Sequence, residues 1–259
     1  SNCIETVLMR YSYGNTVCVS TQVGCRMGCR FCASTQGGRV RNLTAGEIAN
    51  EVYAAARDTG ERVSHIVLMG IGEPLDNFDH VMDFLSIISS PNGVNIGMRN
   101  ISLSTCGLVP MIYKLAERHL GLTLSVSLHA PTDEMRSSMM PVNDVYPVEQ
   151  LIRACRDYQQ ETGRRVSFEY SMVNGVNDSP QTARRLAQLI KGMGAHVNLI
   201  PINPVDGSPY SATDAANVKR FQTLLTELGV NATVRRRLGT DISAACGQLR
   251  REAKGGTTA

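Results

Sequence analysis

The chain has 259 residues, of which 42% are hydrophobic and 19% charged, and its formal net charge is +3. These values are ordinary for a globular protein, and no apolar run approaches the ~18 residues that cross a membrane. We find no signal peptide, and eight cysteines in a chain of this length favour a reducing compartment over a disulfide scaffold. The small positive charge permits nucleic-acid binding without requiring it.

Strand-like and helix-like segments alternate along the whole chain. Thr44 followed by Glu47 has the pattern of a capping box, which marks the start of a helix. Repeated strand–helix units imply parallel strands joined by helical crossovers. The predicted strands are 16–22, 65–70, 101–105, 122–128, 166–173, 197–202 and 232–236. The predicted helices are 45–59, 81–88, 151–158, one that opens at 180, and 218–228.

Six or seven such units are fewer than the eight of a complete barrel. We therefore predict an α/β fold, a partial (β/α)6 barrel of TIM-like form with short terminal extensions. Active sites of barrels lie at the C-terminal ends of the strands. Unusual polar residues occur at these ends, so we expect them to share one cavity: Glu73 after the second strand, Ser104 in the third, Ser127 and His129 at the fourth, and Asn203 after the sixth.

Cys25, Cys29 and Cys32 have the spacing CxxxCxxC, with Phe31 directly before the last cysteine. Three thiolates on one tight loop can hold three irons of a cubane cluster and leave the fourth iron open, whereas electron-transfer ferredoxins fill all four positions with cysteine. A zinc site is the alternative, but zinc usually takes four ligands from CxxC pairs, and no second pair exists. The pattern resembles the signature of radical S-adenosylmethionine (SAM) enzymes, which implies a 4Fe-4S cluster and SAM.

A second motif, Met69 to Pro74, resembles the Gly-Gly-Glu-Pro motif of the same enzymes. Its glycines let the backbone approach a ligand closely, and the carboxylate of Glu73 can accept a hydrogen bond from the ammonium group of SAM. The alternative is an ordinary strand–helix turn with a surface glutamate. The resemblance implies these SAM ligands: Gly72, Glu73, Ser104, Ser127, Leu128, His129 and Asn203.

Longer segments resemble the RlmN/Cfr family, whose members methylate an adenosine of large-subunit ribosomal RNA. The resemblance runs from Glu5 to Leu249. Pro74 favours the RlmN branch, which methylates carbon 2 of adenosine in 23S rRNA and in tRNA, over the Cfr branch, which methylates carbon 8. The matching segments are Gln22–Cys25, Arg41–Thr44, Gly72–Leu75, Ser127–Ala130, Asn198–Pro204 and Ala245–Leu249.

The resemblance also implies a mechanism that consumes two SAM molecules per turnover. The first methylates Cys246 by direct displacement. The second is cleaved to a 5′-deoxyadenosyl radical, which takes hydrogen from that methyl group, and the methylene radical adds to the adenine carbon. Glu5 removes the carbon 2 proton, and Cys18 then attacks Cys246, which forms a transient disulfide and releases the methylated RNA.

The domain organisation that we expect is an N-terminal extension over 1–15, a radical SAM barrel over 16–240 and a C-terminal segment over 241–259 that carries Cys246. Members of the family have a helical domain before the barrel, so the chain looks like the catalytic core alone. The implied partners are 23S rRNA, tRNA and an electron donor such as flavodoxin or ferredoxin. We expect a cytoplasmic monomer without membrane contact, in which Arg39 and Arg41 are candidates for phosphate contacts.

Two other functions remain open at this point. A radical SAM enzyme that shares only the barrel would explain the cysteine loop but not Cys18, Cys246 and Glu5 together. An iron–sulfur electron carrier would need a fourth ligand cysteine and no SAM motif. Cys3, Cys106 and Cys155 match no role in the family, and Cys155 is predicted to lie in the core.

Overall fold

The computed structural model describes residues 2–203 and 208–235. Its described strands form one eight-stranded sheet in the order β1-β2-β5-β6-β7-β8-β9-β10 and a small second sheet of β3 and β4. In chain order they are β1 (Val7–Tyr11), β2 (Gly14–Cys18), β3 (Gln22–Val23), β4 (Arg41–Asn42), β5 (Val63–Leu68), β6 (Ile101–Thr105), β7 (Thr123–Ser127), β8 (Val166–Met172), β9 (His196–Pro201) and β10 (Asn231–Val234).

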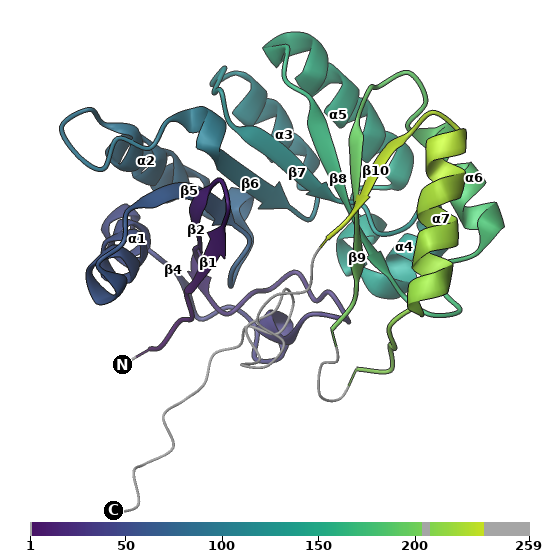
Figure 1. Ribbon diagram of the computed structural model, residues 1–259, viewed down its shortest axis with the longest axis horizontal. Helices are drawn as coiled ribbons and strands as arrows, with labels where there is room; N and C mark the ends of the chain where they lie inside the picture. The colour runs from purple at the N-terminus through teal and green to yellow at the C-terminus, as the bar shows by residue number, and fades with distance from the viewer. Residues whose placement is uncertain (1, 204–207, 236–259) are drawn as a thin grey trace, which may run out of the picture.

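The large sheet is a curved half-barrel, seen in Figure 1 with its helices on the outer side. From β2 to β10 every neighbouring pair of strands is parallel, and only β1 pairs antiparallel, with β2. Seven parallel strands need six helical crossovers, each of which returns the chain to the same end of the sheet. β1 and β10 are the two edges of this sheet, so the predicted partial barrel is confirmed.

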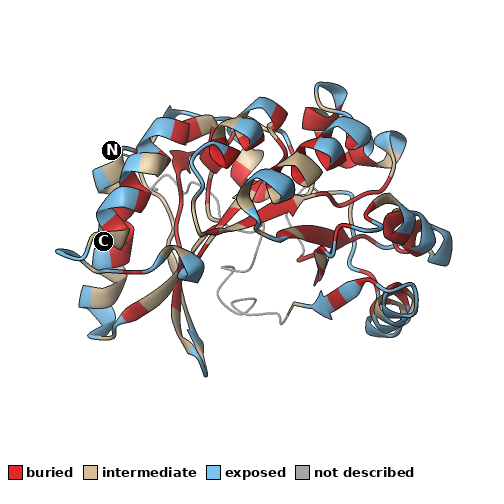
Figure 2. Ribbon diagram, turned by 90° about the horizontal axis from the view of Figure 1, so that it is seen from above, coloured by how far each residue is buried: buried red, intermediate tan, exposed pale blue. Residues whose placement is uncertain are grey.

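The helices cover the convex face of the sheet and bury their inner sides against it (Figure 2). The helix predicted over 45–59 is confirmed: Thr44 accepts from the backbone N–H of Glu47, and the Glu47 carboxylate accepts from the backbone N–H of Thr44. The described α-helices are α1 (Ala45–Thr59), α2 (Phe78–Ser89), α3 (Val109–Ala116), α4 (Asp133–Met139), α5 (Val148–Thr162), α6 (Pro180–Leu189) and α7 (Ala215–Glu227). Short 3-10 turns lie at Ala33–Thr35, Pro74–Asn77, Met98–Asn100 and Pro141–Asp144.

The strand predicted over 16–22 is wrong in its second half. β2 ends at Cys18, and the chain then turns away, because the backbone N–H of Thr21 donates to the carbonyl of Ile71 (2.8 Å) rather than to a neighbouring strand. Gln22 instead pairs with Asn42 in the small second sheet of β3 and β4. This turn sends the following cysteine loop across the C-terminal end of the barrel.

Residues 7–11, in the predicted N-terminal extension, form a strand of the main sheet, with Val7 opposite Cys18. One large core fills the space between sheet and helices and includes Cys155, as predicted. A smaller apolar cluster around Cys29, Cys106 and Met140 lies beside the cysteine loop. No described helix is both long and apolar enough to cross a bilayer.

Candidate active site

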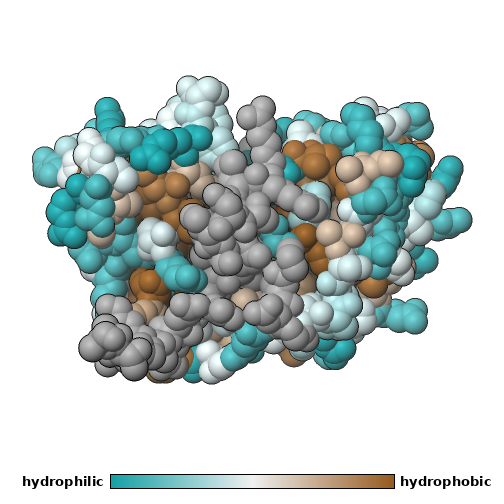
Figure 3. Space-filling model, turned by 60° about the horizontal axis from the view of Figure 1, so that its bottom comes forward, coloured by the Kyte–Doolittle hydropathy of each residue, from teal (hydrophilic) through white to brown (hydrophobic). Residues whose placement is uncertain are grey.

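A pocket lies at the C-terminal ends of the parallel strands, where the sequence predicted a shared cavity. Its lining combines residues of the cysteine loop with residues at the strand ends. On the face shown in Figure 3, the coloured residues are hydrophobic in several inner patches and hydrophilic around the rim. The predicted site residues that line the pocket are Cys25, Cys29, Cys32, Gly72, Glu73, Ser104, Ser127, His129 and Asn203.

The cysteine loop forms one wall of this pocket. The carbonyl of Cys29 accepts from the backbone N–H of Cys32 (3.1 Å), and the Thr35 hydroxyl donates to the carbonyls of both residues. From the other side, the backbone N–H of Arg30 donates to the carbonyl of Met139 at the end of α4 (3.0 Å). These bonds fix the second half of the loop, and Cys25, Cys29 and Cys32 all line the pocket.

Two thiols of the cysteine loop are buried. Burial raises the pKa of Cys25 to about 12 and that of Cys29 well above its usual value. Coordination to a metal ion would favour the thiolate form of both.

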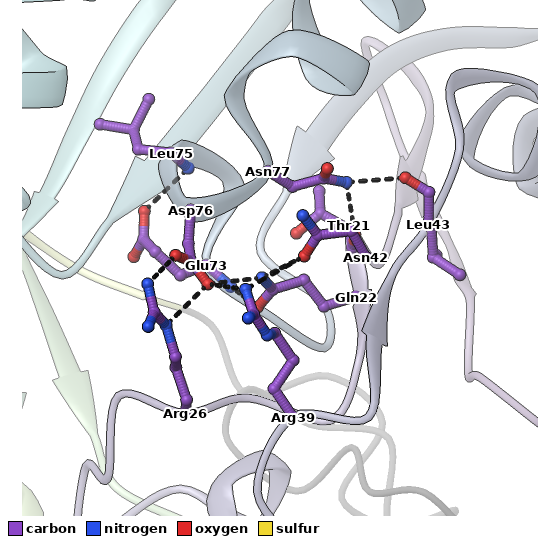
Figure 4. Close-up of polar contacts among 10 residues, drawn as sticks. All are labelled: Thr21, Gln22, Arg26, Arg39, Asn42, Leu43, Glu73, Leu75, Asp76 and Asn77. Atoms are coloured by element: carbon purple, nitrogen blue, oxygen red, sulfur yellow. Dashed lines mark hydrogen bonds and ion pairs between the residues drawn. The ribbon is translucent and has the colours of Figure 1, made fainter.

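The outer side of the cysteine loop is held by a cluster that we name the Asp76 clasp: Gln22, Arg26, Arg39 and Asp76 (Figure 4). The Asp76 carboxylate accepts from Arg26, from Arg39 (2.7 Å) and from Gln22 (2.8 Å). Burial alone would raise the pKa of Asp76, but the hydrogen bonds from Arg26 and Gln22 outweigh it and lower that pKa. The clasp thus ties the cysteine loop to the 3-10 turn after Glu73.

Arg39 and Arg41, the candidates for phosphate contacts, both have carboxylate partners. Arg39 belongs to the Asp76 clasp, and Arg41 pairs with Glu47 of α1 (2.7 Å). The hydrogen bonds from Arg41 and from the backbone of Thr44 lower the pKa of Glu47 to about 2.

Glu73 is almost fully buried and lies on the pocket wall. The alternative of a surface glutamate is therefore wrong. Its carboxylate accepts from the backbone N–H of Cys106 (2.7 Å) and of Leu75 (3.0 Å). Burial raises the pKa of this carboxyl. Gly72 before it has φ +108°, and an added Cβ would lie 2.7 Å from the side chain of Gln22, so only glycine allows this approach.

His129 is buried, and its backbone has φ +57°, a left-handed conformation that residues other than glycine rarely adopt. Its Nδ1 accepts from the backbone N–H of Ser171 (2.9 Å), so the ring proton of the neutral form is on Nε2. Burial, with the charge of Arg136 adding to it, lowers the pKa of His129 to about 3, which keeps the ring neutral. Asn177 donates to the carbonyls of His129 and Ser171 (both 2.7 Å) and thereby holds the strained residue in place.

Leu128 differs from the other predicted SAM ligands. Its side chain is in the main core and does not line the pocket. Its backbone N–H donates to the carbonyl of Glu169 (3.1 Å), and its carbonyl accepts from Arg136 (3.1 Å). Any ligand role of Leu128 would thus involve backbone atoms that already have partners.

Several pocket residues were missed by the sequence analysis. Glu169 on β8 is buried in the wall, where it accepts from Asn198 (2.8 Å) and lies 4.0 Å from Arg235. A single charged residue within an apolar strand was the signal that could have found it. Cys106, which matched no role, lies in the same pocket as the cysteine loop.

Glu5 and Cys18 are not among the residues that line this pocket, and Cys18 pairs with Val7 of the edge strand β1. The carbonyl of Glu5 accepts from the hydroxyl of Ser20 (2.9 Å), and Ser20 also accepts from the backbone N–H of Ile71 (3.0 Å). Cys18 is buried at the end of β2. Cys246 lies outside the described residues, so its pairing with Cys18 stays a prediction.

Glu51 of α1 connects the Glu5 segment to the start of the cysteine loop. One of its oxygens accepts from the hydroxyl of Thr6 and from the backbone N–H of Ser20 (2.9 Å). Burial raises the pKa of this carboxyl to about 8, more than those hydrogen bonds lower it. The carboxyl is therefore neutral at pH 7, which removes the need for a cationic partner.

Comparison with known proteins agrees with this geometry. The radical SAM superfamily model matches residues 19–187. The chain is 57% identical over 250 residues to the probable dual-specificity RNA methyltransferase RlmN of Desulforamulus reducens, covering 96% of this chain and 71% of that protein. It is 56% identical to the protein of the same name from Desulforudis audaxviator, with coverage of 96% and 79%.

Solved structures give the same result. A radical SAM methyltransferase from Sphaerobacter thermophilus superposes with a TM-score of 0.92 at 51% identity, over 95% of this chain and 73% of that one. SuiB of Streptococcus suis, bound to S-adenosylmethionine, shares the fold with a TM-score of 0.65 at 15% identity, over 85% of this chain and 50% of that one. With the cysteine loop and the Gly-Glu-Pro turn on one pocket, these similarities establish that the chain belongs to the RlmN family of radical SAM enzymes.

Proposed function

We propose that this chain methylates carbon 2 of an adenosine in 23S rRNA and in tRNA. The observation that carries the proposal is the pocket, whose wall combines the three cysteines of the CxxxCxxC loop with Glu73 and the strand-end residues. RNA as the substrate class is supported by high identity to relatives that are named dual-specificity RNA methyltransferases.

In this proposal Cys25, Cys29 and Cys32 hold a 4Fe-4S cluster beside bound SAM. When bound, the cluster supplies the electron that splits SAM reductively. Glu73 accepts from the ammonium group of SAM, because its buried carboxyl lies on the pocket wall and gains a counter-charge from that group. The neutral ring of His129 can donate from Nε2 toward the ligand. The further SAM contacts come from Gly72, Ser104, Ser127, Asn203 and the backbone of Leu128.

Cys246, Glu5 and Cys18 carry the methyl group and release the product. The Cys246 thiolate receives a methyl group from one SAM, and a second SAM is consumed in activating that group for addition to the adenine carbon. The RNA adduct would return one electron to the oxidised cluster, and Glu5 accepts the carbon 2 proton. The Cys18 thiolate then attacks the Cys246 sulfur: a disulfide bond forms, the bond from Cys246 sulfur to the transferred carbon breaks, and its electron pair stays with the RNA, where it takes up a proton to complete the methyl group.

The remaining parts of the proposal concern the surroundings of the reaction. We propose that the barrel spans 16–240, that 241–259 carries Cys246, and that the protein works as a monomer in the cytoplasm. Reduced flavodoxin or ferredoxin would deliver the electron. The chain covers 71–79% of the length of the first two relatives.

The test is product analysis with anaerobically reconstituted protein, SAM and an rRNA fragment. We expect 2-methyladenosine by mass spectrometry of the digested RNA, whereas 8-methyladenosine would support the Cfr-type alternative, and unmodified RNA with SAM cleavage would support another radical SAM function. Cys18→Ala should stall as a covalent protein–RNA adduct on a denaturing gel, and Cys246→Ala should form none. An adduct in Cys246→Ala would contradict the roles of both cysteines.

A further inference from the structure

Arg136 of α4 is completely buried, with none of its surface exposed. A buried guanidinium normally has a carboxylate partner, because an isolated charge loses its hydration on burial. Among the described residues, none of the ion pairs includes Arg136. A cation in this position needs an explanation.

All the hydrogen bonds that Arg136 donates go to neutral oxygens. Nη2 donates to the carbonyls of Cys106 (2.6 Å) and Ser127 (3.0 Å), and Nε donates to the carbonyl of Leu128 (3.1 Å). Nη1 donates to the side-chain oxygen of Asn143 (3.2 Å). Arg136 therefore joins the C-terminal ends of β6 and β7, and within the described residues none of these bonds is to a charged acceptor.

The charge of Arg136 lies beside the cysteine loop. The carbonyl of Cys106 that it contacts belongs to a residue of the pocket wall, and Cys106 packs in the same small apolar cluster as Cys29. α4 itself contacts the loop through the bond from Arg30 to Met139.

Among the described residues, the charged groups near Arg136 form no direct ion pair with it, although the charge of Asp133 partly offsets the lowering of the Arg136 pKa by burial. His129 is neutral, because burial lowers its pKa to about 3. Asp133, on the same helix, uses one carboxylate oxygen for Asn143 (3.1 Å) and the backbone N–H of Val148 (2.7 Å) at the start of α5. Apart from Cys29 and Cys106, the buried residues of the small apolar cluster are methionine, valine and isoleucine.

We propose that Arg136 is the resident counter-charge of the cluster held by Cys25, Cys29 and Cys32, and that it raises the reduction potential of that cluster. The inference rests on the proposed function, because it requires the cluster. A cubane with three thiolates is anionic, and reduction adds one more negative charge. A fixed cation nearby in a site of low dielectric constant stabilises the reduced state more than the oxidised one.

The test compares a neutral and a cationic replacement in the full-length protein, reconstituted anaerobically with iron and sulfide. Arg136→Met removes the charge at similar volume, and Arg136→Lys keeps it while losing the planar set of donors. The readouts are iron content and a redox titration followed by the electron paramagnetic resonance signal of the reduced cluster. For Arg136→Met we expect the ratio of reduced to oxidised cluster at fixed potential to fall about tenfold, which is ~59 mV for one electron. Arg136→Lys should stay close to the wild type.

Arg156 supplies a matched control, because it also clamps carbonyls but lies away from the pocket. It donates to the carbonyls of Leu189 (3.2 Å) and Lys191 (3.1 Å) at the end of α6. Arg156→Met should lower the unfolding midpoint without changing the potential. If Arg136→Met does not fold, Arg136→Gln replaces it, since an amide keeps donors for the carbonyls and carries no charge.

The outcomes separate this proposal from the one on which it rests. In one outcome, the wild type binds iron and the neutral variant shows the same reduction potential as the wild type. That result overturns the role of Arg136 and leaves the cluster assignment intact. A potential in Arg136→Lys that falls as far as in the neutral variant also overturns it, because geometry rather than charge would then be responsible. A wild-type protein that binds no iron after reconstitution refutes both proposals.

Discussion

The two sides of the cysteine loop hold arginine in opposite ways. In the Asp76 clasp, the side chains of Arg26 and Arg39 are 58% and 30% exposed and share one carboxylate. On the pocket side, Arg136 is fully buried and donates only to neutral oxygens. Water solvates the outer arginines whether or not they are paired, so their ion pairs stabilise weakly. Water does not reach the buried Arg136, so among the described residues its charge is stabilised by the hydrogen bonds to neutral oxygens. Loss of these bonds should therefore cost more free energy than loss of an exposed ion pair.

The largest difference between the two sides should appear when the loop itself is changed. Cys29→Ala removes a buried thiol on the pocket side, whereas Arg26→Ala removes only an arm of the Asp76 clasp. We expect Cys29→Ala to abolish both cluster iron and SAM cleavage, because one iron loses its protein ligand. Arg26→Ala should retain iron. Iron analysis and deoxyadenosine formation after anaerobic reconstitution measure both, and full iron content in Cys29→Ala would contradict the cluster assignment.

Glu51 extends the comparison to a buried carboxyl whose hydrogen bonds, within the described residues, come from Thr6 and Ser20 and not from an arginine. Burial raises its folded-state pKa from 4.5 to about 8, so its contribution to stability is complete below pH ~4.5 and is lost as the pH rises toward 8. Glu51→Gln keeps the acceptor for Thr6 and Ser20 but cannot ionise. We expect the difference in unfolding free energy between wild type and variant to change by about 1.4 kcal/mol per pH unit within this window, to the disadvantage of the wild type.

Urea unfolding of both proteins at several pH values between 5 and 8 measures that slope, and carboxylates common to both cancel in the difference. Glu47 makes a suitable control, because its pKa is lowered to about 2 by the hydrogen bonds from Arg41 and Thr44. Glu47→Gln should show no such slope above pH 5. Parallel pH profiles for wild type and Glu51→Gln would mean that Glu51 is ionised in the folded protein.

Glu73 tests whether a buried carboxyl on the pocket side acts on the ligand. Glu73→Gln keeps the volume and one acceptor for the backbone of Cys106 or Leu75, but cannot pair with an ammonium group. Hydrogen bonds to charged groups contribute about 1.5–3 kcal/mol, so we expect SAM affinity to fall at least tenfold in calorimetry on reconstituted protein. Glu169→Gln is the control, because Asn198 and Arg235 already engage that carboxylate. Equal losses in both variants would remove the special role of Glu73.

Much of this site was predictable because its signals are local in sequence. The cysteine spacing, the Gly-Glu-Pro turn and the polar residues at strand ends all lie within short segments, and the parallel sheet brings them to one end. The burial of Arg136 was not predictable, since it lies in a short polar helix where arginine normally faces solvent. Only the packing of α4 against the ends of β6 and β7 encloses it. The end of β2 at Cys18 was also not predictable from local sequence. It depends on a hydrogen bond between Thr21 and Ile71, which are fifty residues apart.

The smallest effect should come from the Asp76 clasp. Asp76→Asn keeps the size of the side chain and removes the charge that holds Arg26 and Arg39. Because both arginines reach solvent, we expect a loss of only about 1 kcal/mol in unfolding free energy, and less at high salt, where such pairs are screened. Urea unfolding at low and high salt measures this loss, and a double-mutant cycle with Arg39→Ala isolates the pair. A loss of several kcal/mol that persists in high salt would show that the clasp behaves like a buried network, and the contrast between the two sides of the cysteine loop would then be wrong.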